Sequence, residues 1–209
     1  DGYKGWVKKK YLDKPMTSNY KISSIVATVH FEPKVRSNTI FNLSLNALLT
    51  VIEIKRDWAK IKINKGLYEY DYGFVHTNHI KPKKTKILDW VSYTEKFIGI
   101  PYKWGGRSYN GIDCSALLQL SLSSAGICVK RNCNEQKKLL RKYPSNHNVF
   151  CRGDIFFWKR HVGIGLNSNE IIHANGFHMK TIVEKRKTAI DRIYFEEGEL
   201  IAKYNIPVL

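Results

Sequence analysis

A glycine-rich loop, Pro101-Tyr102-Lys103-Trp104-Gly105-Gly106, leads through Gly111-Ile112-Asp113-Cys114-Ser115 into an apolar stretch at residues 114–125 that predicts a helix. This order places Cys114 at the start of that helix. The free backbone N–H groups and the dipole of a helix N-terminus stabilise a thiolate, the attacking form of cysteine. The same N–H groups can bind a developing oxyanion. The stretch therefore predicts a nucleophile, although a cysteine taken alone is more often a small buried apolar side chain.

A thiolate nucleophile needs a base, and two histidines are suitably placed. His161 begins the strand-like run Val162-Gly163-Ile164-Gly165-Leu166, and His173 ends the next run, Ile171-Ile172-His173. A histidine base is itself oriented by a third polar group. We expect neighbouring strands to bring the two together, with His161 as the base and His173 orienting it. From spacing alone, both could equally be ordinary, partly buried histidines.

Five motifs occur in a fixed order along the second half of the chain. They are Tyr102-x-Trp104-Gly105-Gly106, Gly111-x-Asp113-Cys114-Ser115, Gly153-Asp154, His161-Val162-Gly163-Ile164 and Ile172-His173-Ala174. With these motifs, residues 87–205 resemble the NlpC family of papain-like cell-wall cysteine peptidases. The resemblance implies Cys114 as nucleophile, His161 as its base and His173 as the residue that orients the base.

The resemblance also implies the surroundings of the nucleophile. It suggests that Tyr102, Trp104, Asp113 and Ser115 lie around the oxyanion and the substrate, and that the reaction needs no metal ion and no organic cofactor. One position departs from the family pattern, because Ala116 stands where the family usually has a glycine. Alanine is small and favours helix, so we expect little effect.

The order of the expected elements predicts an α+β fold. Helical spacing at residues 87–98, 114–125 and 134–142 is followed by strand-like runs. These runs lie at residues 154–158, 162–166, 170–173, 181–184 and 199–204. Helices first and strands afterwards are typical of helices packed on an antiparallel sheet. The papain-like catalytic domain that the resemblance implies has this architecture.

The first half of the chain has a different residue pattern. Residues 24–31, 46–55 and 58–63 are rich in β-branched side chains and predict the short strands of a small barrel or sandwich. With Asp57-Trp58-Ala59-Lys60-Ile61 and Gly73-Phe74-Val75, this region resembles the bacterial SH3-like domains of cell-wall enzymes.

The expected domain boundaries follow from the residue patterns of the two halves. Residues 5–12 weakly repeat the pattern of residues 73–80, so we expect residues 1–21 to be the end of a preceding SH3-like domain or a linker. An SH3-like β-barrel domain is predicted at residues 22–82 and an NlpC-type catalytic domain at residues 83–209, joined at the charged, proline-containing segment that follows Ile80.

The composition limits the possible partners. The chain has 209 residues and a formal net charge of +17, which attracts nucleic acid, acidic lipid or carboxylate-rich wall polymer. The basic residues are spread along the chain without a nucleic-acid-binding motif, so we expect no specific nucleic-acid partner. No run of eighteen apolar residues predicts a membrane span. Four cysteines are too few for a disulfide scaffold at this length, and a Cys128–Cys133 disulfide stays open.

The resemblance implies hydrolysis of peptidoglycan stem peptides or of their released fragments, usually at the γ-D-glutamyl–diamino acid bond. Two alternatives stay open: a muramyl-L-alanine amidase of the same superfamily, and a catalytically inactive basic wall-binding protein. The family implies a bacterial protein, in the cytoplasm for peptide recycling or in the cell envelope. The sequence leaves open the identity of the diamino acid and the oligomeric state.

A finer expectation concerns Asp113. Some family members with SH3-like domains act only on peptides with a free N-terminal L-Ala, and an acid beside the nucleophile would hold that ammonium. Asp113 is in this position, but it can equally be the N-cap of the helix that begins at Cys114.

Overall fold

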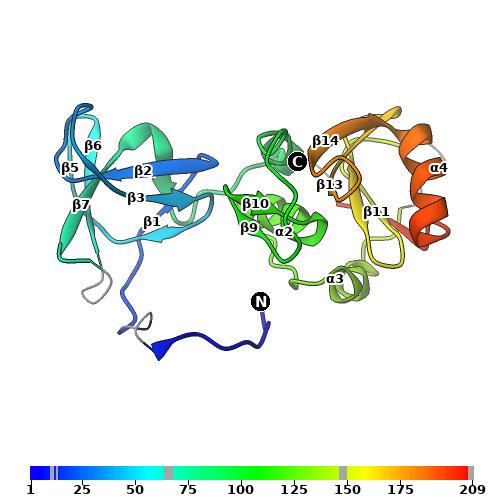
Figure 1. Cartoon of the computed structure of the whole chain (residues 1–209), viewed down its shortest axis with the longest axis horizontal. Coiled ribbons are helices and arrows are strands. Elements are labelled where there is room, and N and C mark those ends of the chain that lie inside the picture. Colours follow the sequence, from blue (N-terminus) through cyan, green and yellow to red (C-terminus); the bar gives the residue numbers. More distant parts are fainter. Residues whose placement is uncertain (10–11, 13, 64–67, 146–149, 207–209) are drawn as a thin grey trace. The chain divides into compact units, whose positions relative to one another are not determined.

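The computed structural model describes residues 1–9, 12, 14–63, 68–145 and 150–206 (Figure 1). The chain divides into two compact units. The N-terminal unit is Lys4–Thr85, and the C-terminal unit combines Lys86–Leu209 with Asp1–Tyr3. The described residues ahead of Tyr20 contain no strand. The domain limits at residues 21 and 82, and the origin of residues 1–21, stay predictions; residues 10 and 11 of the weak repeat lie outside the described residues.

The N-terminal unit consists of two small antiparallel sheets (Figure 1). One has the order β4-β1-β8 and the other has the order β3-β2-β7-β6-β5. The strands are β1 (Tyr20–Ile22), β2 (Val26–His30), β3 (Thr39–Ser44), β4 (Leu48–Leu49), β5 (Val51–Lys55), β6 (Trp58–Lys62), β7 (Tyr72–His76) and β8 (Ile80–Pro82). Alternation along β2 and β6 buries Ala27, Val29, Ala59 and Ile61 in one core. Two small sheets around a shared core suit the predicted barrel, and the SH3-like assignment stays a prediction.

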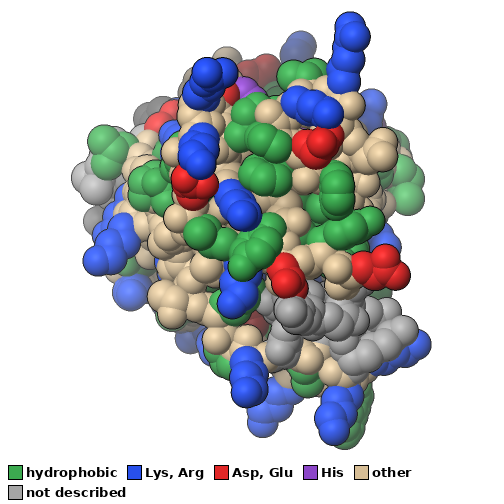
Figure 2. Space-filling view, turned by 90° about the vertical axis from the view of Figure 1, so that its left-hand side faces the viewer, with side chains coloured by type: hydrophobic (Ala, Val, Ile, Leu, Met, Phe, Trp, Pro, Cys, Tyr) green, Lys and Arg blue, Asp and Glu red, His purple; other side chains and the backbone are tan. Residues whose placement is uncertain are grey.

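Basic side chains are dispersed over one face of the molecule. On the face that Figure 2 shows, Lys and Arg side chains are scattered among hydrophobic side chains and are not gathered in one stripe. None of the described helices is long and apolar enough to cross a bilayer.

The C-terminal unit is an antiparallel sheet with helices on it. The sheet has the order β14-β13-β12-β11-β15. Its strands are β11 (Asp154–Phe157), β12 (Val162–Gly165), β13 (Glu170–Asn175), β14 (Lys180–Lys185) and β15 (Ala202–Asn205), and every pairing between them is antiparallel. The helices are α1 (Trp90–Glu95), α2 (Cys114–Ser124), α3 (Cys133–Leu140) and α4 (Arg186–Glu197). Helix α2 packs against β12 and β13, and α4 lies on the other side of the sheet (Figure 1). The α+β prediction is thereby confirmed.

Two helices differ from the sequence-based expectation. The helix expected at residues 87–98 is shorter, because the Asp89 carboxylate accepts hydrogen bonds from the backbone of Val91 and Ser92 and so starts α1 at Trp90. Helix α4 was not predicted at all. It buries only Ala189 and Ile193, so its apolar stripe is too narrow to show helical periodicity.

Candidate active site

Cys114 is the first residue of α2, as predicted. Asp113 is the N-cap, and its Oδ1 accepts a hydrogen bond of 2.8 Å from the backbone N–H of Ala116. A short hairpin of β9 (Arg107–Ser108) and β10 (Gly111–Ile112) precedes this turn and fixes the entry into the helix. The α2 residues that follow are almost all buried, so packing holds the helix on all sides. The nucleophile candidate thus stands on a rigid element with free backbone N–H groups around it.

The two predicted histidines lie in contact. His161 Nε2 is 2.8 Å from His173 Nδ1. His173 is completely buried in β13, and its Nε2 is 2.5 Å from Glu184 Oε2 on the neighbouring strand β14. Arg192 of α4 donates to the same carboxylate oxygen over 2.6 Å. These contacts form a continuous chain from α4 through the sheet to His161.

The hydrogen-bond network assigns the tautomers. Burial lowers the pKa of His173 despite the opposing effect of Glu184, so His173 is neutral and carries one ring proton. The pKa of Glu184 is about 2: desolvation raises it, but the hydrogen bonds from His173 and Arg192 and the charge of Arg192 lower it by more. The carboxylate can only accept, so His173 Nε2 donates to it. His173 Nδ1 then accepts from His161 Nε2, which leaves the lone pair on His161 Nδ1 free to act as a base.

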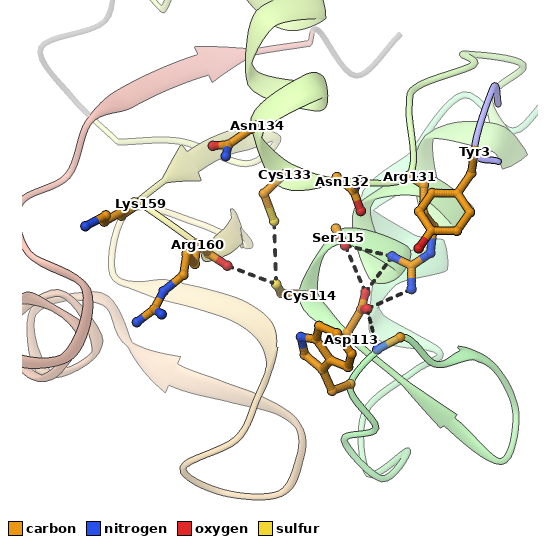
Figure 3. A pocket seen from close by; sticks show the side chains of 12 residues that line it. Tyr3, Asp113, Cys114, Ser115, Arg131, Asn132, Cys133, Asn134, Lys159 and Arg160 are labelled. Carbon is orange, nitrogen blue, oxygen red and sulfur yellow. Dashed lines mark hydrogen bonds and ion pairs between the residues drawn. The ribbon is translucent and has the colours of Figure 1, made fainter. Parts of the chain in front are cut away.

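The Cys114 thiol lies close to Cys133, the carbonyl group of Arg160 and His161. Its Sγ is 3.7 Å from Cys133 Sγ and 4.0 Å from the carbonyl oxygen of Arg160 (Figure 3). The contact with Cys133 and burial raise the pKa of Cys114, whereas the charge and the hydrogen bond of His161 lower it, and the net direction is upward. The helix N-terminus favours a thiolate, whereas the raised pKa of Cys114 favours the protonated thiol, so a proton acceptor such as His161 is needed for ionisation.

Tyr102 lies close to the nucleophile on the loop that precedes it. Burial and the nearby Cys114 raise the pKa of Tyr102 to about 12. Its hydroxyl therefore stays protonated and can donate a hydrogen bond to an oxyanion. Its backbone N–H donates to the carbonyl of Met179, which ties the loop to the turn between β13 and β14.

Asp113 and Ser115 are bound into a buried network with Arg131. The Arg131 guanidinium contacts Asp113 Oδ1 at 2.9 Å and Oδ2 at 2.7 Å, and it donates to Ser115 Oγ over 2.8 Å (Figure 3). Ser115 Oγ and the Gly105 N–H also donate to the Asp113 carboxylate. With Ala116, these donors saturate Asp113. The geometry favours the N-cap reading of Asp113, and substrate binding by Asp113 and Ser115 stays a prediction.

A cavity of about 310 Å³ opens beside Cys114. It is lined by Trp104, Arg131, Asn132, Cys133, Lys159 and Arg160, among others. Trp104 is 87% exposed, so its indole is available to a ligand, and its part in substrate binding stays a prediction. Asp113 and Arg131 neutralise each other, and the other charged side chains on the lining, Lys159 and Arg160, are positive.

Sequence reasoning missed four residues of this site: Cys133, Arg131, Glu184 and Arg192. Glu184 is two residues beyond Ile182, the β14 partner of His173, and therefore lies on the same face of the sheet. Alternation along the predicted strand at 181–184 could have indicated it. Arg131 and Cys133 reach the site only through the fold of the segment between α2 and α3, and no local pattern signals them. Among the described residues, no His, Cys, Asp or Glu cluster is arranged to hold a metal ion.

The fold and the Cys–His–His geometry define a papain-like α+β domain, and comparison with known proteins assigns the family. Residues 99–197 match the family model described as NlpC/P60 family, so the chain carries an NlpC/P60 domain.

Similar proteins extend the likeness beyond this domain. Dipeptidyl-peptidase 6 of Lysinibacillus sphaericus is 24% identical over 76% of this chain and 61% of its own length. The γ-D-glutamyl-L-lysine dipeptidyl-peptidase of Bacillus subtilis is 26% identical over 93% of this chain and 70% of its own length. The crystal structure of a Bacillus cereus NlpC/P60 family protein superposes with a TM-score of 0.73 at 18% identity, over 90% of this chain and 62% of that one. The chain thus spans about three fifths of the Lysinibacillus relative.

Proposed function

We propose that the chain is a cysteine peptidase that hydrolyses peptidoglycan stem peptides at the γ-D-glutamyl–diamino acid bond. The observation that carries the proposal is the hydrogen-bonded chain from Glu184 through His173 to His161, which leaves His161 Nδ1 as a base for the Cys114 thiol. The names of the relatives support the substrate class, since one names a γ-D-glutamyl-L-lysine bond.

The geometry supports an acyl-enzyme route. His161 takes the proton of Cys114, and the thiolate attacks the γ-carbonyl carbon of D-Glu. The oxyanion accepts hydrogen bonds from backbone N–H groups at the start of α2 and from the Tyr102 hydroxyl. Protonated His161 then donates to the departing amine of the diamino acid, the C–N bond breaks, and an acyl thioester remains. Water, deprotonated by His161, hydrolyses the thioester.

Product analysis with a defined peptide tests this proposal. Incubation of the chain with L-Ala-γ-D-Glu-L-Lys, or with the diaminopimelate equivalent, is expected to release the free diamino acid, and mass spectrometry identifies it. Cys114→Ala is expected to abolish release, whereas Cys128→Ala, at an exposed cysteine, keeps it. If the unaltered chain leaves both peptides intact, the peptidase proposal is overturned.

The two alternatives give different results in the same assay. A muramyl-L-alanine amidase would leave the tripeptide whole and would expose a new N-terminal Ala on a muramyl peptide. An inactive wall-binding protein would bind wall and release nothing.

A preference for a free N-terminal L-Ala is the finer part of the proposal. It is supported by the relatives named as dipeptidyl-peptidases, a term for enzymes that release a dipeptide from a free amino end. Asp113 is a poor ligand for that ammonium, because Arg131 already neutralises it. Comparison of the tripeptide with its N-acetylated form tests the preference, and equal rates of cleavage would exclude it.

The partners and the location follow from the same proposal. The substrate would be a stem peptide or a released fragment. The similar proteins cited above are bacterial. Both the cytoplasm and the cell envelope suit a peptidoglycan peptidase, and fractionation of cells that produce the protein would distinguish them.

A further inference from the structure

A second thiol faces the nucleophile across the cavity. Cys133 is the first residue of α3, and its Sγ is 3.7 Å from that of Cys114, the first residue of α2 (Figure 3). Neither sulfur is bonded, and the mechanism proposed above uses only one of them. A disulfide has an S–S length of about 2.05 Å, so a side-chain rotation that closes roughly 1.6 Å would join the two.

The surroundings of Cys133 are those of a reactive thiol. The hydrogen bond from Cys114 lowers the pKa of Cys133 and outweighs the opposing effect of burial. Arg131 is two residues away in sequence and interacts with both thiols, but its charge is paired with Asp113, whose carboxylate opposes the lowering of the Cys133 pKa. Cys133 is also partly exposed and lines the cavity together with Lys159. Partly exposed thiols in electropositive surroundings are the ones that oxidants attack.

We propose that Cys133 is a site of reversible oxidation by small hydroperoxides, and that it forms a disulfide with Cys114. Cys133 gives up its proton, its sulfur bonds the terminal peroxide oxygen, and the O–O bond breaks. The departing alkoxide, or hydroxide from H2O2, takes up that proton and leaves as an alcohol or as water. The sulfur of Cys133 becomes a sulfenic acid and is oxidised by two electrons.

The second step closes the disulfide. His161 takes the proton of Cys114, whose sulfur attacks Cys133, and the S–O bond breaks. The departing hydroxide takes the proton from His161 and leaves as water. In sum, two thiols and one hydroperoxide give one disulfide, one alcohol and one water. The disulfide consumes the nucleophile, and a dithiol reductant restores both thiols.

Peptide mapping of the whole chain tests the proposal without any substrate. The reduced protein is treated with a small excess of H2O2, blocked with a maleimide and digested, and linked peptides are identified by mass spectrometry. We expect most of the oxidised protein to carry a Cys114–Cys133 link with the loss of two hydrogen atoms, and dithiothreitol to reverse it.

Single replacements sharpen the test. In Cys114→Ser, Cys133 should be trapped by a sulfenic-acid reagent and, with more H2O2, should gain two oxygen atoms. In the matched thiol variants Cys128→Ser and Cys151→Ser, the Cys114–Cys133 link should form as in the parent. Thiols that stay reduced, or a link to Cys128 or Cys151 instead, would overturn the proposal.

The outcome is independent of the peptidase proposal. A chain that forms the disulfide but cleaves no stem peptide keeps this inference and loses the proposed function. A chain that cleaves the peptide but forms no such link keeps the proposed function and loses this inference.

Discussion

At the scale of single residues, the site depends on groups that never touch the substrate. Glu184 fixes the proton of His173, and His173 fixes the proton of His161. The charge of Glu184 is stabilised by Arg192, whose guanidinium is mostly buried beside it. The reactivity of the thiol is therefore set several bonds away from it, by the pairing of two strands and one helix.

Replacement of Glu184 by Gln tests this positioning role. The amide lacks the charge and can donate to His173, so His173 no longer has one enforced tautomer. We expect kcat for stem-peptide cleavage to fall by roughly 10²-fold, the lower end of what a positioned general base contributes, with KM little changed. The pH profile of kcat should shift as well, which a purely structural loss would not cause. Glu199→Gln, at an exposed glutamate of the same unit, is the control; equal effects of the two replacements would refute the role.

The depressed pKa of Glu184 predicts that the free energy of unfolding depends on pH in the acidic range. The pKa of Glu184 lies at about 2 in the folded chain against an ordinary value of 4.5. A depressed pKa stabilises the folded state above the ordinary value, and this contribution is lost as the pH falls from about 4.5 towards about 2. Urea unfolding should therefore show wild type more stable than Glu184→Gln at neutral pH. The difference should shrink steadily through that acidic range, and a constant difference would contradict the assignment.

At the scale of elements, α4 matters more than its sequence suggests. It supplies Arg192 to the site, yet only two of its side chains are buried. Ile193 packs with Phe156, Trp158 and Ile171 in one cluster on the sheet. This small contact area must hold the helix, and with it the guanidinium that neutralises Glu184.

We expect Ile193→Ala to lower the free energy of unfolding by about 2–5 kcal/mol, the range for a buried aliphatic side chain cut to alanine. The cost arises because the packed cluster cannot collapse fully around the missing atoms. Phe195→Ala, at a side chain that is 87% exposed on the same helix, should change it by less than about 0.5 kcal/mol. Urea unfolding measures both, and a similar loss in the two variants would show that Ile193 does not anchor α4.

At the scale of the whole molecule, the two units have separate cores. Val29 is completely buried in the N-terminal core, and Leu118 is completely buried in α2 of the C-terminal unit. The residues of the Cys–His–His–Glu chain all belong to the C-terminal unit. We therefore expect that loss of stability in the N-terminal unit leaves the reactivity of Cys114 unchanged.

Val29→Ala should destabilise Lys4–Thr85 by roughly 2 kcal/mol through the loss of two methyl groups and the cavity left behind. Hydrogen exchange followed by mass spectrometry should then accelerate in peptides of this unit alone, while alkylation of Cys114 keeps its rate. Leu118→Ala should give the reverse pattern of exchange. Acceleration spread evenly over the chain in both variants would mean that the units unfold as one.

The sequence by itself determined what depends on local pattern. Helix-then-strand order indicated the α+β class, and the run into residues 114–125 placed Cys114 at a helix start. The expectation that neighbouring strand runs bring His161 and His173 together is met, although His173 lies inside β13 and not at its end. These inferences hold because periodicity and chain order dictate which faces and ends can meet.

Only the tertiary structure decided which groups surround those residues. It paired Asp113 with Arg131, placed Glu184 and Arg192 behind His173, and brought Cys133 up to Cys114. The physical reason is that a pKa, a tautomer or a thiol–thiol contact depends on distances of a few ångströms between segments far apart in the chain. No spacing in the sequence encodes such distances, because they arise when helices and strands pack.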